Sequence, residues 1–186
     1  MHRDLIFVCH ASTRATRLAT FPADDPIDEA GRTRAVVAAT SASGRGQAWC
    51  APSLAARQTA LACGLDATDE PAIRDCDFGR WAGRPVADVL RDEPDGFRAW
   101  MTDPGSAPHG GEPLNALVAR VGRWLDERRQ ARGGGIAVTH PAVVRAAIIH
   151  ALEATTATFW HLDIAPLSQT CLRTDGRRWT LRSLHE

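Results

Sequence analysis

Two histidines and an aspartate in this chain are of the types that carry out phosphoryl-transfer or acid/base chemistry. His10 directly follows an apolar run at residues 5–9, and His140 directly follows another at residues 136–139. A neutral imidazole can attack phosphorus and form a covalent intermediate, while a second imidazole stabilises the developing charge. A carboxylic acid such as Asp75 can donate a proton to the leaving oxygen. These residues predict nucleophilic catalysis with an acid partner, provided that the fold brings them together; the alternative is two strand-end histidines satisfied by hydrogen bonds.

The elements that must position these side chains alternate between short strands and helices. Apolar runs predict strands at residues 5–9, 47–50, 72–76 and 136–139. Helical spacing predicts helices from residue 27, over 53–63, after 85, over 95–101, over 112–131 and over 141–154. The alternation predicts an α/β fold, a three-layer sandwich with a mainly parallel central sheet flanked by helices. Ligands of such sheets bind beyond the carboxyl ends of the strands, where we expect the three side chains to meet.

Three local signals fix the ends of elements. Ser53 is a suitable N-cap for the second helix, and Pro141 suits the first turn of the last one. Near the end of the chain, Asp175 and Gly176 predict a hairpin turn between strands at residues 171–173 and 179–181. The length of 186 residues fits a single domain covering residues 1–186.

Five sequence blocks, in order along nearly the whole chain, resemble those of a known family. They are C-H-A-S-T at residues 9–13, A-P-S-L-A-A-R-Q-T-A at 51–60, D-C-D-F-G-R-W-A-G at 75–83, G-G-E-P at 110–113 and T-H-P-A-V-V-R at 139–145. The blocks are similar to R-H-G-x-T, S-P-x-x-R-A-x-Q-T-A, E-x-D-F-G-x-W-E-G, G-G-E-S and S-H-G-x-x-x-R. These patterns are typical of the histidine phosphatase superfamily, the phosphoglycerate mutase-like proteins.

The resemblance implies a phosphoglycerate mutase-like fold and a hydrolase of a small phosphomonoester that works through a phosphohistidine intermediate. By position, His10 would be the nucleophile and His140 the second histidine of the phosphate pocket. Asp75 stands where the family usually has a glutamate proton donor, and Thr13 would lie near the bound anion. The reaction needs no metal and no cofactor.

The sequence departs from the family at the two arginines that clamp phosphate, because Cys9 and Ala55 occupy their positions. A hydrogen bond to a charged group contributes about 1.5–3 kcal/mol, so each loss costs about 10- to 100-fold in binding or rate. Arg14 and Arg57 are the candidates for compensation, and Ser12 and Thr13 complete the candidate substrate-binding set. Arg57, two residues beyond the empty position, is expected on another face of its helix.

Other uses of the same pocket stay open. Without the arginines, the histidines and the acid could perform acid/base chemistry on a neutral or carboxylated substrate, or the chain could be a ligand-binding pseudophosphatase. A third possibility is a metal site at one end of the sheet, formed by Cys9, His10, Cys50, Cys76 and His140. Alternation along a strand argues against it, because neighbouring residues such as Cys9 and His10 point to opposite faces.

Neither Cys9 nor Cys50 fits the pattern of a cysteine-based phosphatase, in which an arginine stands six positions after the cysteine. The residue six positions beyond Cys9 is Ala15, and that beyond Cys50 is Ala56.

The composition limits the classes of partner and the cellular compartment that we expect for this chain. Acidic and basic residues number 22 each, so no bulk field attracts nucleic acid or a membrane. All the basic residues are Arg, and the absence of Lys excludes a Schiff-base or P-loop lysine. No apolar run predicts a signal peptide or a membrane span, and the five cysteines form no CxxC pair. We therefore expect a cytoplasmic protein with free thiols that acts on a small phosphorylated or anionic molecule, its oligomeric state open.

Overall fold

The central feature of the fold is a six-stranded sheet. A computed structural model describes residues 2–42, 46–131 and 133–185 of the chain. The strands are β1 (Arg3–Cys9), β2 (Gln47–Cys50), β3 (Ala67–Asp69), β4 (Gly135–Thr139), β5 (Gln169–Thr174) and β6 (Trp179–His185), in the order β3-β2-β4-β1-β5-β6. The first four pair in parallel, and β5 and β6 add an antiparallel edge. The expected α/β fold with a mainly parallel sheet is confirmed.

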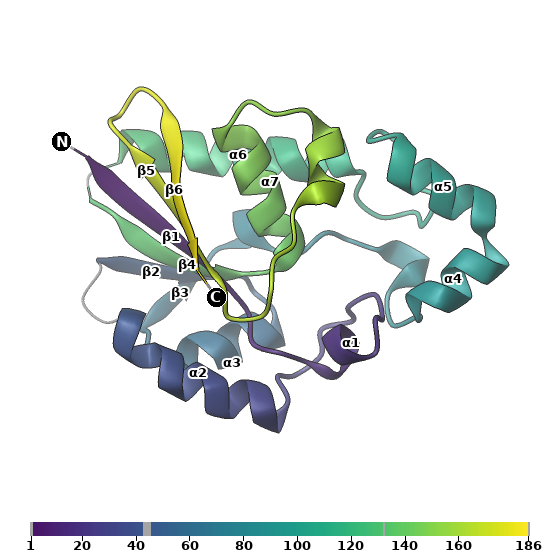
Figure 1. Ribbon diagram of the computed structural model, residues 1–186, viewed down its shortest axis with the longest axis horizontal. Coiled ribbons are helices and arrows are strands. Elements are labelled where there is room, and N and C mark those ends of the chain that lie inside the picture. The colour runs from purple at the N-terminus through teal and green to yellow at the C-terminus, as the bar shows by residue number, and fades with distance from the viewer. Residues whose placement is uncertain (1, 43–45, 132, 186) are drawn as a thin grey trace.

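Helices cover both faces of this sheet. Those with α-helical geometry are α1 (Arg14–Arg17), α2 (Glu29–Ala42), α3 (Leu54–Ala62), α4 (Val86–Asp92), α5 (Pro94–Thr102), α6 (Leu114–Gln130) and α7 (Pro141–Ala151). Short 3₁₀ turns span Pro71–Ile73, Gly79–Trp81 and Thr156–His161. Helices α2 and α3 pack on one face, and α6 and α7 pack on the other (Figure 1). None of the helices in the described ranges has both the length and the apolar character needed to cross a bilayer.

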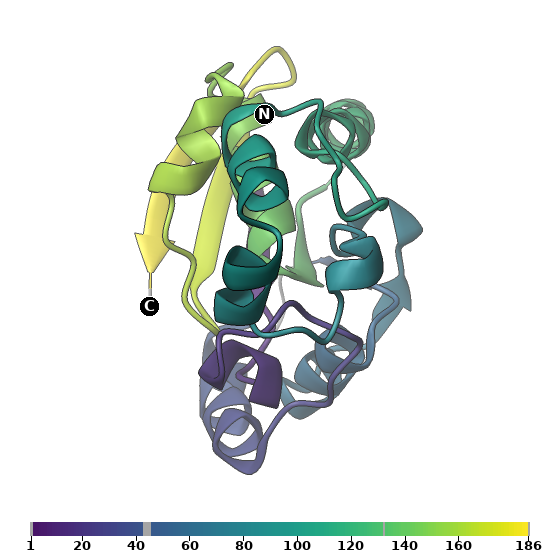
Figure 2. The same ribbon diagram turned by 90° about the vertical axis from the view of Figure 1, so that its right-hand side faces the viewer.

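Strands β1 and β4 form the buried centre of the sheet. All five residues of β4 are buried, as are the last five of β1. Their parallel register pairs Cys9 with Thr139, so both strands end at the same level. The segments of α1 and of α4 and α5 lie at this end of the molecule, in purple and teal in Figure 2. The residues after β1 and β4 therefore emerge side by side at one end of the sheet.

The local signals in the sequence act as expected. Ser53 caps α3, with its side chain accepting from the backbone N–H of Ala56, and Pro141 occupies the first turn of α7. Asp175 and Gly176 lie between β5 and β6, and Gly176 adopts a φ of 93° that favours glycine.

One predicted strand is wrong. Residues 72–76 do not form a strand. The strand that pairs with the outer side of β2 is instead β3, which ends at Asp69. Pro71 has no N–H to donate to a neighbouring strand, and it starts a 3₁₀ turn that the Glu70 side chain caps through the N–H of Ala72. Asp75 therefore reaches the end of the sheet on a loop rather than at a strand end.

Candidate active site

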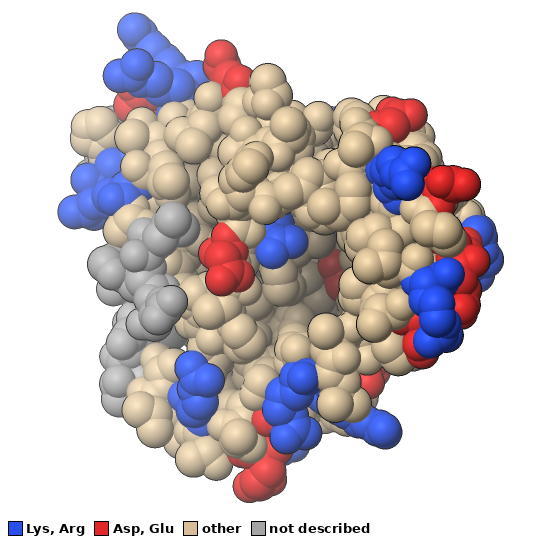
Figure 3. Space-filling model, turned by 45° about the vertical axis from the view of Figure 1, so that its right-hand side comes forward, with Lys and Arg blue, Asp and Glu red and all other residues tan. Residues whose placement is uncertain are grey.

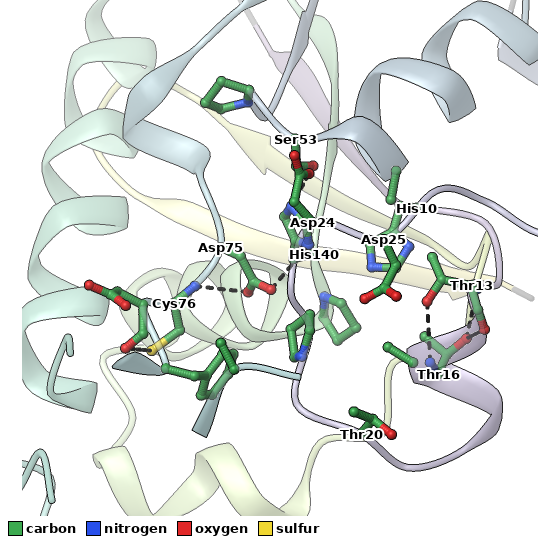
Figure 4. Close-up of a pocket in the computed structure, with 18 residues that line it drawn as sticks. His10, Thr13, Thr16, Thr20, Asp24, Asp25, Ser53, Asp75, Cys76 and His140 are labelled. Carbon is green, nitrogen blue, oxygen red and sulfur yellow. Dashed lines mark hydrogen bonds and ion pairs between the residues drawn. The ribbon is translucent and has the colours of Figure 1, made fainter. Parts of the chain in front are cut away.

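A cavity of about 350 Å³ opens at the carboxyl ends of β1 and β4. His10, Thr13, Ser53, Asp75 and His140 are among the residues that line it (Figure 4). Figure 3 shows the molecular surface hollowed on this side, with acidic atoms inside the hollow. The position agrees with the rule that open α/β sheets bind ligands beyond the carboxyl ends of their strands.

His10 sits directly after β1, and its backbone N–H donates to the carbonyl of Thr139 at 2.8 Å. The side chain is 5% exposed, and its Nδ1 lies 2.7 Å from the carbonyl oxygen of Ala11. A carbonyl oxygen only accepts, so this contact places the ring proton on Nδ1. The lone pair is left on Nε2, which has no hydrogen-bond partner among the described residues. His10 therefore presents an unprotonated ring nitrogen to the cavity that it lines.

His140 sits directly after β4 and is the N-cap residue of α7. Its ring lies against that of His10, with a centroid separation of 4.9 Å and an interplanar angle of 65°. Its Nε2 lies 2.9 Å from Oγ of Ser53, and its Nδ1 lies 3.2 Å from Oδ2 of Asp75. The two imidazoles are thus adjacent. The contact with Ser53 orients the ring of His140, whereas Nδ1 lies near Asp75 without forming a hydrogen bond.

Asp75 is held at the cavity although its segment is not a strand. The hydroxyl of Thr139 donates to the carbonyl of Ile73 at 2.7 Å, which ties the segment to the end of β4. Arg120 of α6 donates to the backbone carbonyl of Asp75 at 3.3 Å and forms a largely buried ion pair with Glu112 at 2.6 Å. The carboxylate of Asp75 itself accepts from its neighbour's backbone N–H at 2.8 Å. These contacts leave its Oδ2 facing His140.

Burial sets the protonation of these three groups. Burial, assisted by the nearby charge of His140, lowers the pKa of His10 to about 4. Burial also lowers the pKa of His140 to about 4. It raises the pKa of Asp75 to about 6, because a desolvated carboxylate is disfavoured. Near pH 6 the site therefore holds two neutral imidazoles and a carboxyl group poised between its two protonation states.

Of the four residues expected to bind substrate, Thr13 alone lines the cavity. It is 3% exposed and caps α1. Ser12 instead donates to Asp28 at 2.9 Å, and Arg57 forms an exposed ion pair with Asp69. Arg14 is exposed on α1 and does not line the cavity. The structure thus brings His10, His140, Asp75 and Thr13 together and places Ser12, Arg14 and Arg57 elsewhere.

The charge of the cavity wall is a feature that the sequence analysis missed. Asp24, Asp25 and Asp77 line the cavity in addition to Asp75, whereas no basic side chain among the described residues does. Asp24 and Asp25 stand as a pair in a loop flanked by prolines, and this doublet so soon after His10 is the signal that could have identified them. The ligand therefore meets a wall that is acidic, not basic.

Cys9 and Ala55, the two positions where the family resemblance places arginines, have different surroundings. Ala55 lies in the first turn of α3 and lines the cavity. Cys9 is fully buried at the end of β1 and is not part of the cavity wall. Burial of Cys9 raises the pKa of its thiol far above the usual range. Of the two, Ala55 is the position from which a longer side chain enters the cavity directly.

The cysteines do not gather around the histidines. Cys9, Cys50, Cys63, Cys76 and Cys171 are all free thiols, as expected. Within residues 2–42, 46–131 and 133–185, no three His, Cys, Asp or Glu side chains come together as ligands of a metal ion would. The proposed metal set at the sheet end is therefore not assembled in this structure.

Comparisons with known proteins bear on this arrangement. The family model described as "Histidine phosphatase superfamily (branch 1)" matches residues 5–186. A phosphoserine phosphatase 1 from Hydrogenobacter thermophilus is 28% identical over 135 residues, covering 71% of this chain and 64% of the relative. A bifunctional protein of Mycobacterium tuberculosis is 30% identical over 121 residues, covering 63% of this chain and 33% of the relative. The chain thus spans less than two thirds of the length of these relatives.

The fold also matches solved structures over its whole length. A mycobacterial glucosyl-3-phosphoglycerate phosphatase, solved with VO3, has a TM-score of 0.86 and is 26% identical, with 97% of both chains covered. The structural likeness extends over both layers of helices and the sheet that carries the two histidines.

Proposed function

Because the chain belongs to the histidine phosphatase superfamily, we propose that it is a hydrolase of a small phosphomonoester that acts through a phosphohistidine intermediate on His10. The observation that carries the proposal is the arrangement of the two imidazoles, 4.9 Å apart at their centroids in a cavity at the strand ends. The phosphatases among its relatives support the same reaction class. The substrate is a small molecule, in keeping with the size of the cavity.

The first step is attack by His10. The hydrogen bond from Nδ1 to Ala11 keeps the lone pair on Nε2, and the low pKa of His10 keeps the ring neutral above about pH 4. The Nε2 lone pair forms a bond to phosphorus while the bond from phosphorus to the ester oxygen breaks. The ring of His140 lies against that of His10, so it is close enough to stabilise charge that develops on the phosphoryl oxygens.

Asp75 supplies the proton that the leaving oxygen needs. Its pKa of about 6 means that much of the population carries a proton at mildly acidic pH. The proton passes to the leaving alkoxide, which departs as an alcohol. In the second step, a water molecule gives its proton to the Asp75 carboxylate and attacks phosphorus, and the bond to Nε2 breaks to release inorganic phosphate. His10 returns to its starting state.

A second candidate function rests on the acidic cavity wall. No basic side chain lines the cavity within the described chain, so the phosphate clamp of the family has no substitute there. The same imidazoles and acid would suit acid/base chemistry on a ligand without a phosphoryl group, or simple ligand binding. This alternative predicts that His10 never becomes phosphorylated.

Trapping the intermediate separates the two candidates. The protein is mixed with p-nitrophenyl phosphate, quenched in alkaline denaturant to preserve phosphohistidine, and analysed by peptide mass spectrometry. We expect one phosphoryl group on His10, no label and no turnover for His10→Ala, and normal labelling for His161→Ala, whose exposed histidine lies outside the cavity. Turnover by His10→Ala at the wild-type rate would contradict the assigned nucleophile.

A further inference from the structure

We infer that the preferred substrate is a phosphomonoester whose alcohol part carries an ammonium group, a selectivity set by the carboxylates of Asp24, Asp25 and Asp77. The inference rests on the proposed function, because it names the substrate class of the same site. It follows from the charge of the side chains around the imidazoles, which differs from what a phosphate pocket ordinarily offers.

The three carboxylates are held in place by backbone N–H groups. Asp24 accepts from Leu54 N at 2.6 Å at the start of α3, and Asp25 accepts from Ala23 N at 3.2 Å. Asp77, from the segment that also carries Asp75, accepts from Gly79 N at 2.8 Å.

Each of these side chains lines the cavity and keeps one carboxylate oxygen without a protein partner among the described residues. In the view of Figure 4, Asp24 overlaps His140 and Asp25 overlaps His10, while Asp75 is drawn between His140 and Cys76. These free oxygens are available to accept hydrogen bonds from a ligand.

Among the residues that the structure describes, no basic side chain lines the cavity beside these carboxylates. Of the arginines considered as compensation, Arg57 is neutralised by Asp69 on the surface, and Arg14 lies outside the cavity wall. The two imidazoles do not supply positive charge either, because burial lowers their pKa values and keeps both rings neutral above about pH 4.

The charges of Arg120 and Arg145 act on the site from behind the cavity wall, Arg120 on Asp75 and His140, and Arg145 on Cys9 beside His10, but neither side chain lines the cavity. A phosphoryl group at His10 therefore meets no basic side chain in the described cavity wall, and a substrate with a second anionic group adds further repulsion.

A second observation places the reacting group beside this wall. His10 is 5% exposed, and its Nε2 has no partner within the described chain although the residue lines the cavity. The unpartnered nitrogen is open to the cavity, so a phosphoryl group bound to it lies in the same space as the carboxylates. An ammonium group on the same ligand, a few bonds from phosphorus, meets the carboxylates while the phosphoryl group meets the imidazoles.

The test compares three esters of similar size: O-phosphoethanolamine with an ammonium group, ethyl phosphate without a second charge, and 2-carboxyethyl phosphate with a carboxylate. We expect kcat/KM to fall in that order, by about two- to fivefold at each step, as for a partly exposed charge pair. Added salt should compress the differences, because it screens charges that contact solvent.

Charge-removing variants identify the residues responsible. Asp25→Asn and Asp77→Asn should lower kcat/KM for the ammonium ester and raise it for the carboxylate ester. Damage to the fold lowers both values, so the opposite signs are specific to charge. Asp95→Asn is the control, since that side chain is 93% exposed beside Arg98 and lies outside the cavity.

Each outcome decides a separate point. If the carboxylate ester is the best substrate, or if the two variants lower all three values equally, the inference is overturned while the phosphatase proposal stands. If no ester is turned over and His10 takes up no phosphoryl group, both proposals fail together. Preference for the ammonium ester with opposite effects of Asp25→Asn supports both.

Discussion

The floor of the cavity and its rim are built in different ways. The floor, defined by His10, His140 and Ser53, is attached to the ends of β1 and β4 and to the start of α3. Its two histidines are 4–5% exposed. The rim, defined by Asp24, Asp25 and Asp77, lies on loops, and its carboxylates are held by single backbone N–H groups.

Because of this difference, the residues proposed to carry out the reaction and the residues proposed to select the ligand lie on separate parts of the structure. The floor is fixed by buried strands whose register leaves little freedom, so the imidazoles keep the geometry that phosphoryl transfer requires. The rim sits on connecting segments, where side chains change at little cost to the fold. A member of this family can therefore keep its nucleophile and still present an acidic wall to its substrate.

The largest expected effect concerns pH, and it tests the floor. His10 must be unprotonated to attack, which holds above its pKa of about 4, and Asp75 must be protonated to donate, which holds below its pKa of about 6. We expect kcat/KM to be highest between these two pKa values. Above the pKa of Asp75, about 6, kcat/KM should fall about tenfold per pH unit, which is about 100-fold over two units.

Asp75→Asn should remove the alkaline fall and lower the maximum. The loss should be greater for an alkyl phosphate than for p-nitrophenyl phosphate, whose leaving oxygen needs less help from an acid. A rate that climbs steadily into the alkaline range for the wild type would show that Asp75 is not the proton donor.

The next largest effect is expected when an arginine is introduced into the cavity wall beside the rim. Ala55→Arg places a guanidinium in the cavity from the first turn of α3, and one charge-assisted contact to phosphate is expected to raise kcat/KM by about 10- to 100-fold. The same change should weaken the preference for an ammonium substrate, since it offsets one carboxylate.

Ala55→Gln is the matched control, because it adds length without charge. Melting curves of both variants show whether the added volume at this buried position is tolerated, and the comparison is made between variants that remain folded. An equal gain from Gln and Arg would mean that the missing charge is not what limits the wild-type site.

The smallest effect concerns Ser53, which links the floor to a helix end. Its Oγ lies 2.9 Å from Nε2 of His140 and accepts from Ala56 N at 3.3 Å. Ser53→Ala should lower the free energy of unfolding by about 1 kcal/mol through loss of the cap. It should also lower kcat by about five- to tenfold, because His140 loses a hydrogen-bond partner.

Ser53→Thr keeps the hydroxyl and should restore both quantities. The effect of Ser53 on catalysis is distinguished from its effect on stability by measuring kcat well below the melting temperature. At such a temperature the fraction of folded protein is the same for each variant. Unchanged kcat in folded Ser53→Ala would show that the hydroxyl does not position His140.

The sequence by itself determined three of the four parallel strands, the ends of most helices and the positions of His10 and His140 at the ends of two of those strands. Those features depend on local patterns: a buried strand needs a continuous apolar run, and the residue after it emerges at the sheet end whatever follows. The third strand was misplaced because residues 72–76 mix buried and exposed side chains, with only Ile73 and Cys76 buried, and Pro71 prevents strand pairing at their start.

Only the tertiary structure decided which charges surround the imidazoles. Whether Arg14, Arg57, Asp24 or Asp25 faces the cavity depends on the direction of side chains on loops and helix surfaces, and sequence spacing does not fix that direction. Arg57 turned to Asp69, which lies 12 positions later in the chain, while the Asp24 carboxylate reached the start of α3, 30 positions away. Electrostatic energy depends on distance through space, so the charge of the site was set by the folded arrangement and not by any local pattern of residues.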